Sequence, residues 1–296
     1  MGKVESNIKQ EKKLTAFDKR IHEIDFVRGL LIILVVMDHI FWNFKSHGAN
    51  WPGFNNDFFV WYWTGRCGDF YLPLRLFIQP MALMAFCFLS GISCAFSKNN
   101  WKRAIETLIV WAVITIGSNI LQAISNANSW GLEVRIDFNI IGVLGFSMLF
   151  YCFVQKRSWK ALLAAILISL LIYFYVMPNL KENLIRIFGS MTIEKAGHEM
   201  EIPKFYLPMF FFPPNGGFFG SPQADYVALF PYVSFFFGGA LFAYKFYKKD
   251  RKSLVKKFEF ERPVCFIGRH TLLIYLCHMP IVMGIFALID VIVKNC

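Results

Sequence analysis

Seven stretches of this 296-residue chain are long and apolar enough to cross a lipid bilayer, and they constrain its fold more than any other feature. They occupy residues 24–44, 72–96, 104–123, 138–154, 161–176, 225–247 and 267–293. A segment that crosses a bilayer must satisfy its backbone polar groups internally, and a helix does this within one segment. The sequence therefore predicts an all-α fold, a polytopic membrane helix bundle with about seven transmembrane helices.

Three parts of the chain differ in composition from these spans. Residues 1–20 are polar with six Lys or Arg, and we interpret them as a basic tail before a single transmembrane domain at 21–296. The aromatic segment 205–219 contains prolines and a Gly-Gly pair that break any continuous helix, so we expect a re-entrant or interfacial segment. The polar connection 178–204 is interpreted as a lid, an acceptor surface or a solvated loop.

Lys and Arg are distributed unevenly between alternate loops. The N-terminal tail holds six, residues 97–103 three, residues 155–160 three and residues 245–269 nine, whereas the opposite side holds nine spread over longer loops. The positive-inside rule therefore places the N-terminus in the cytoplasm and the C-terminus outside. The net charge of +11 reflects this asymmetry and an attraction to anionic membrane lipids. It does not indicate nucleic-acid binding, because the basic residues flank membrane spans.

The first span carries charge where hydrocarbon disfavours it, at Asp25, Arg28, Asp38 and His39. Arg28 and His39 lie about 20° apart around a helix and about 16 Å apart along it, with Asp25 on the same face. If Arg28 lies near one interface, His39 lies near mid-membrane, where an ionisable residue is functional by default. We therefore expect His39 to line a site. The alternative is a structural histidine satisfied by a neighbouring helix.

The last span has a second polar face. Thr271, Tyr275 and His278 lie within about 60° of one another on a helix, and His278 lies about 15 Å from Gly268, the depth inferred for His39. Two such faces would line a polar channel between the helices. The sequence thus predicts that His278 and Tyr275 share a site with His39.

The cytoplasmic end of this channel would be cationic. Arg28, Arg269 and His270 form a cluster suited to phosphate groups. The alternative is that Arg28 pairs with Asp25 one turn away and that Arg269 extends to lipid headgroups.

Two residues are candidates at the external end. Asp225 begins the sixth span, where it either caps the helix or hydrogen-bonds an external substrate. His47 follows the first span and would serve the same external chamber.

Several other enzyme classes lack their motifs in this chain. There is no G-x-S-x-G, Walker A, G-x-G-x-x-G or H-E-x-x-H, and the seven Cys include no C-x-x-C. No metal is expected. A histidine-centred membrane site with cationic groups at its cytoplasmic end fits group transfer by general base catalysis.

Four motifs, in this order, resemble bacterial members of the heparan-alpha-glucosaminide N-acetyltransferase catalytic-domain family. They are EIDFVRG at 23–29, FLSGIS at 88–93 followed by NWKR at 100–103, ADYVALFP at 224–231, and GRHTLLIYLCH at 268–278. The resemblance extends over about residues 21–280. The Arg-x10-His spacing of Arg28 and His39 is also similar to that of the wider membrane acyltransferase group that O-acetylates bacterial cell-surface sugars.

The resemblance implies a multi-pass enzyme of the bacterial cytoplasmic membrane. Acetyl-CoA would enter from the cytoplasm as acyl donor, and the acetyl group would reach a hydroxyl or amine of an extracytoplasmic saccharide. In the lysosomal member of the family an Asn stands in the place of His39. Its essential His lies just beyond the first helix, where His47 is the nearest candidate here.

Each candidate residue then has an expected role. We expect His39 to act as the base, with Asp38 or Asp25 orienting it, and Tyr275 and His278 to donate hydrogen bonds to the oxyanion. Arg28, Arg269 and His270 would hold the CoA phosphates, and Asp225 would contact the acceptor.

Two other functional classes remain open. A proton-coupled transporter would use the same intramembrane Asp, Arg and His residues as a relay. A membrane scaffold would use them as paired interior charges.

Overall fold

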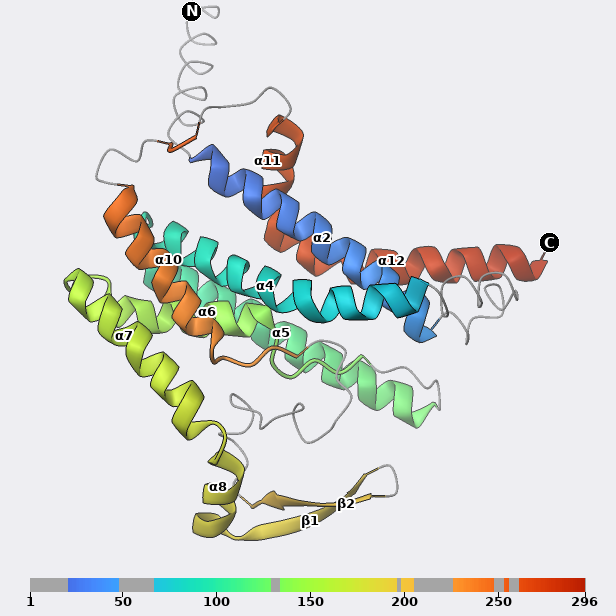
Figure 1. Ribbon diagram of the computed structural model, residues 1–296. Helices are drawn as coiled ribbons and strands as arrows, with labels where there is room; N and C mark the ends of the chain where they lie inside the picture. Colours follow the sequence, from blue (N-terminus) through green and yellow to red (C-terminus); the bar gives the residue numbers. More distant parts are fainter. Residues whose placement is uncertain are drawn as a thin grey trace, which may run out of the picture. The chain divides into compact units, whose positions relative to one another are not determined.

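The computed structural model describes residues 21–47, 67–128, 134–195, 198–204, 226–247, 253–255 and 261–295. Helices dominate these residues (Figure 1). The helices are α2 (His22–His47), α4 (Cys67–Ala95), α5 (Asn100–Ala127), α6 (Ile140–Val154), α7 (Trp159–Leu171) with the π-helical turn η4 (Ile172–Val176), α8 (Leu180–Phe188), α10 (Tyr232–Phe246), α11 (Glu261–Arg269) and α12 (Thr271–Asn295). The strands are β1 (Ser190–Lys195) and β2 (His198–Pro203). The basic tail 1–20, the segment 205–219 and Asp225 lie outside the described residues.

Three described helices are long and apolar enough to cross a membrane, at Pro73–Ala95, Asn100–Ala127 and Trp159–Val176. A fourth span results if Glu261–Arg269 and Thr271–Phe286, which are bent by 82°, are taken together. The predicted count of about seven spans is therefore not confirmed. The helix α2 is not among these spans, because it carries the charged residues Asp25, Arg28 and Asp38.

Two predicted spans are shorter helices than expected. The buried Asn139 begins α6 because its side chain accepts hydrogen bonds from the amides of Ile141 and Gly142, at 3.1 and 3.3 Å. The helix α10 begins only after Pro231. Each helix has 15 residues, about 22 Å of helix against a hydrocarbon core of about 30 Å.

The last predicted span is broken. The chain turns at His270, so Gly268 and Arg269 end α11 and His278 belongs to α12. The Thr271 hydroxyl donates to the Gly268 carbonyl at 2.7 Å, which satisfies a carbonyl at the end of α11. The helix predicted over 267–293 therefore begins only at Thr271, and its first predicted residues belong to α11 and the turn.

The polar connection 178–204 is structured, and the fold is not purely α-helical. The helix α8 precedes an antiparallel hairpin of β1 and β2, whose register runs from Ser190 opposite Pro203 to Lys195 opposite His198. Apolar and polar residues alternate in MTIEK and in HEMEI, the period of a strand.

The chain forms two compact units. One consists of residues 1–82 and 247–296, and in it α2 packs against α11 and α12. The other consists of residues 83–246, and in it α5 packs on α6 while α10 packs on α6 and α7.

Glycine explains one motif of the second unit. A Cβ atom added at Gly91 of α4 would lie 1.9 Å from the Phe236 carbonyl oxygen. One added at Gly239 of α10 would lie equally close, 1.9 Å, to the Phe88 carbonyl oxygen. The FLSGIS motif therefore permits a backbone-to-backbone contact of α4 with α10.

Candidate functional site

The site residues of the first unit are positioned by a close crossing of α2 and α11. A Cβ atom added at Gly29 would lie 2.1 Å from the Val264 carbonyl oxygen, and one at Gly268 would lie 1.8 Å from the Asp25 carbonyl oxygen. Only glycine fits at such distances. The crossing brings together the two motifs that contain Arg28-Gly29 and Gly268-Arg269.

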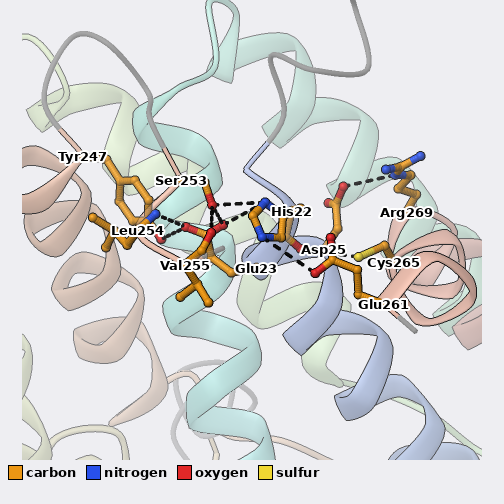
Figure 2. Close-up of polar contacts among 10 residues, drawn as sticks. All are labelled: His22, Glu23, Asp25, Tyr247, Ser253, Leu254, Val255, Glu261, Cys265 and Arg269. Carbon is orange, nitrogen blue, oxygen red and sulfur yellow. Dashed lines mark hydrogen bonds and ion pairs between the residues drawn. The ribbon is translucent and has the colours of Figure 1, made fainter. Parts of the chain in front are cut away.

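Arg269 forms an ion pair with Asp25 across this crossing. Its Nε donates to Asp25 Oδ2 at 3.1 Å, and the two side chains are only 20% and 11% exposed (Figure 2). Sequence analysis placed Arg28 as the alternative partner of Asp25. The pairing of Asp25 with Arg269 joins α2 to α11.

A second group of polar side chains surrounds the buried His22, which sequence analysis did not single out (Figure 2). Its Nδ1 lies 3.0 Å from Ser253 Oγ and 3.4 Å from Glu23 Oε2. Its Nε2 lies 3.7 Å from Glu261 Oε2. Carboxylates of Glu23 and Glu261 therefore lie beside His22, and that of Asp25 lies beside Arg269 of the predicted cationic cluster.

Glu23 ties the start of α2 to residues 253–255. It accepts hydrogen bonds from the Leu254 amide at 2.8 Å, from the Tyr247 hydroxyl at 3.2 Å and from the Ser253 hydroxyl. Burial acts to raise the pKa of Glu23, but these hydrogen bonds outweigh it and hold the pKa below its ordinary value. Glu23 is therefore held as a carboxylate.

His39 and His278 lie against each other, as the sequence predicts, although the continuous helix from which the depth of His278 was inferred bends at His270. Their ring centroids are 4.8 Å apart with an interplanar angle of 77°, an edge-to-face contact between α2 and α12. The Tyr275 ring lies 5.5 Å from the His278 ring. We refer to His39 and His278 as the histidine pair.

The hydrogen bonds of the histidine pair fix where each ring can accept a proton. His39 Nδ1 lies 2.8 Å from the Val35 carbonyl oxygen, and His278 Nδ1 lies 2.7 Å from the Tyr275 carbonyl oxygen. Because a carbonyl oxygen only accepts, each Nδ1 must carry the hydrogen. The lone pair of each neutral ring is then at Nε2, so neutral His278 presents an acceptor there rather than the oxyanion donor that we expected.

Asp38 pairs with Arg75 of α4. Arg75 Nε donates to Asp38 Oδ1 at 2.9 Å and to Oδ2 at 3.2 Å, and the side chains are 15% and 21% exposed. We expected Asp38 or Asp25 to orient the base, whereas these carboxylates bind arginines and His39 Nδ1 is oriented by the Val35 carbonyl.

The remaining predicted residues lie elsewhere. His270 is exposed and its ring stacks on Phe266, with centroids 4.6 Å apart. His47 is the last residue of α2, and its side chain, like all of Asp225, lies outside the described residues. Among the residues that the structure describes, no group of three or more His, Cys, Asp or Glu could hold a metal ion.

The position of Arg75 in the sequence could have indicated an ion pair. It is an arginine within the predicted span 72–96, and it entered the sequence analysis only as part of a loop count. An intramembrane arginine implies a nearby acidic partner, but the sequence does not say which one. The close crossing at Gly29 and Gly268 left no comparable signal beyond the glycines themselves.

The comparisons with known proteins agree with the motifs at these positions. The family model described as "Heparan-alpha-glucosaminide N-acetyltransferase, catalytic" matches residues 20–280. No curated protein and no solved structure matches the chain. Since the family match covers most of the chain and includes α2, α11 and the histidine pair, the chain belongs to the heparan-alpha-glucosaminide N-acetyltransferase catalytic-domain family.

Proposed function

We propose that this membrane acetyltransferase moves an acetyl group from cytoplasmic acetyl-CoA to a hydroxyl or amine of an extracytoplasmic saccharide. Family membership supports the reaction class. The Lys and Arg asymmetry of the sequence supports donor entry from the cytoplasm. The observation that carries the proposal is the histidine pair, two imidazoles 4.8 Å apart on helices of a membrane protein.

His39 is the base of the proposed reaction. The acceptor O–H or N–H attacks the thioester carbonyl carbon while His39 Nε2 removes the acceptor proton. A bond forms between the acceptor and the acetyl carbon, and the C–S bond then breaks. The proton passes from His39 to the CoA thiolate, so the products are acetylated saccharide and free CoA.

The neighbouring residues hold the reactants. Tyr275 donates its hydroxyl hydrogen to the oxyanion, and His278 holds the His39 ring edge to face. Arg28, Arg269 and His270 bind the CoA phosphates at the cytoplasmic end, and Asp225 contacts the acceptor. A covalent acetyl-histidine intermediate is an alternative route to the same products.

The proposal is tested with purified protein in detergent, [14C]acetyl-CoA, and glucose and glucosamine as hydroxyl and amine probes. Release of free CoA and of labelled sugar is measured together. His39→Ala is expected to bind acetyl-CoA normally and to lose transfer by at least about 100-fold, since general base catalysis contributes about 10²- to 10⁴-fold.

The matched control is His47→Ala, which is expected to retain most of the activity. Normal transfer by His39→Ala together with an inactive His47→Ala would move the base to His47. If the protein were a transporter, the wild-type protein would not cleave acetyl-CoA, whichever acceptor is present. Membership of an acetyltransferase family does not support the transporter function.

A further inference from the structure

A partly buried ion pair includes the residue that precedes the proposed base. Asp38 precedes His39 on α2, and both oxygens of its carboxylate accept from Arg75 Nε, at 2.9 and 3.2 Å. The two side chains are only 21% and 15% exposed. Neither residue of this pair contacts a reacting atom in the proposed reaction.

The positions of the two residues along their helices agree with a shared depth. Asp38 lies nine residues before the end of α2 at His47, and Arg75 lies eight residues after the start of α4 at Cys67, which correspond to about 14 and 12 Å of helix. If α2 and α4 are successive spans, Arg75 therefore reaches α2 at the level of His39. An arginine and an aspartate at this depth are each unfavourable alone and are offset by pairing.

We infer that the Asp38–Arg75 ion pair is a positioning element of the base: it fixes α2 at His39 and cancels the carboxylate charge beside the imidazole. The inference rests on the proposed role of His39. The unpaired Asp38 carboxylate would favour a protonated imidazole, whereas the unpaired Arg75 guanidinium would disfavour it.

Described groups on three helices lie near His39. On α2 they are Asp38 and the Val35 carbonyl that accepts from Nδ1. From α12 they are His278, whose ring lies 4.8 Å away, and Tyr275 beyond it, 5.5 Å from the His278 ring. On α4, Arg75 pairs with Asp38, the residue that precedes His39. Of these residues only Asp38 and Arg75 carry a full charge when the histidines are neutral.

The test measures the pH dependence of kcat for acetyl transfer in the wild-type protein, in Asp38→Asn and in the double variant Asp38→Asn/Arg75→Gln. Arg75 cannot lose its proton, so Asp38→Asn leaves a fixed cation near His39. The pH at which kcat is half maximal on the acid side should then fall by about one unit. The double variant removes both charges, so this pH should return to the wild-type value.

The positioning role is read from kcat at the pH plateau. Both variants should lose kcat by about tenfold or more, because a base displaced by about 1 Å can lose up to about 100-fold. The binding of acetyl-CoA should be unchanged. Lys102→Ala, which removes an exposed ion pair with Glu106 in α5, is the control and should change neither quantity.

Folding is checked by the yield and thermal midpoint of the detergent-solubilised protein, and Arg75→Lys supplies a charge-conserving variant if the others unfold. Arg75→Lys should keep the wild-type acid midpoint with a reduced plateau. A wild-type acid midpoint and plateau in Asp38→Asn would overturn the inference while leaving the proposed function standing. Absence of thioester cleavage by the wild-type protein would instead refute the proposed function.

Discussion

The histidine pair, Asp25 and Asp38 are each held by a specific partner. The Nδ1 atoms of the histidine pair are committed to the carbonyls of Val35 and Tyr275. The carboxylates of Asp25 and Asp38 are committed to Arg269 and Arg75. At the scale of single residues, this leaves the Nε2 atoms as the positions where the histidine pair can exchange a proton.

Variants of the Arg269–Asp25 pair distinguish two roles for Arg269: binding CoA phosphates and joining α2 to α11. If the guanidinium also binds CoA phosphates, Arg269→Ala should weaken acetyl-CoA binding about tenfold or more, whereas Asp25→Asn should leave it unchanged or tighten it, because the cation is retained. Isothermal titration of both variants with acetyl-CoA distinguishes these outcomes. Equal weakening in both variants would show that the pair only joins α2 to α11, and His270→Ala tests the neighbouring cationic candidate in the same way.

Part of this site could be predicted from the sequence alone. The spacing of Arg28 and His39 and the depth of His278 predicted that the two histidines share a site, and their ring contact agrees with this. The partners of Asp25 and Asp38 could not be predicted, because an ion pair between helices depends on which helices meet. That information resides in tertiary packing, which short-range periodicity does not encode.

At the scale of helices, glycine sets which backbones touch. Gly268 of α11 lies so close to α2 that an added Cβ atom would meet the Asp25 carbonyl oxygen at 1.8 Å. Gly268→Ala should therefore force the helices apart and lower the free energy of unfolding by about 1–3 kcal/mol. The thermal unfolding midpoint in detergent measures this change.

Gly284 of α12 is the matched control, because no atom of the described residues lies within 4 Å of a Cβ atom added there. Gly284→Ala should be neutral or slightly stabilising, since alanine favours helix by up to about 1 kcal/mol. Equal midpoints for the wild-type protein and Gly268→Ala would contradict the close crossing of α2 and α11.

The contact of α2 with residues 253–255 should depend on pH through Glu23. The pKa of Glu23 in the folded protein lies below its ordinary value of 4.5, because its hydrogen bonds outweigh the effect of burial. A carboxyl group with a lowered pKa stabilises the folded state fully above its ordinary pKa and loses that contribution as the pH falls through the lower folded value. Below pH 4.5, the unfolding midpoint of the wild-type protein should therefore fall more steeply than that of Glu23→Gln.

Glu106→Gln, an exposed acid of α5, is the control for this titration and should follow the wild-type curve. If Glu23→Gln also follows the wild-type curve throughout the acid range, the hydrogen bonds of Glu23 do not contribute to the stability of the fold.

Across the whole molecule, helix-forming segments are easier to predict from sequence than membrane spans. Helices lie within all seven predicted apolar stretches, yet in the part of the chain that the structure describes only three helices, or four with the bent pair, are long and apolar enough to cross. The differences arise from local hydrogen bonds: Asn139 delays the start of α6, and the turn at His270 divides α11 from α12. Hydropathy averages over such residues and does not detect them.

The central claim is that acetyl transfer crosses the membrane through the site of His39. It is tested in proteoliposomes with a chitosan oligosaccharide trapped inside as a non-permeant acceptor and [14C]acetyl-CoA added outside. The account predicts that label accumulates on the trapped saccharide with stoichiometric release of CoA outside, and that His39→Ala reduces this by at least about 100-fold. Label confined to external acceptors, or equal labelling by His39→Ala and the wild-type protein, would contradict it.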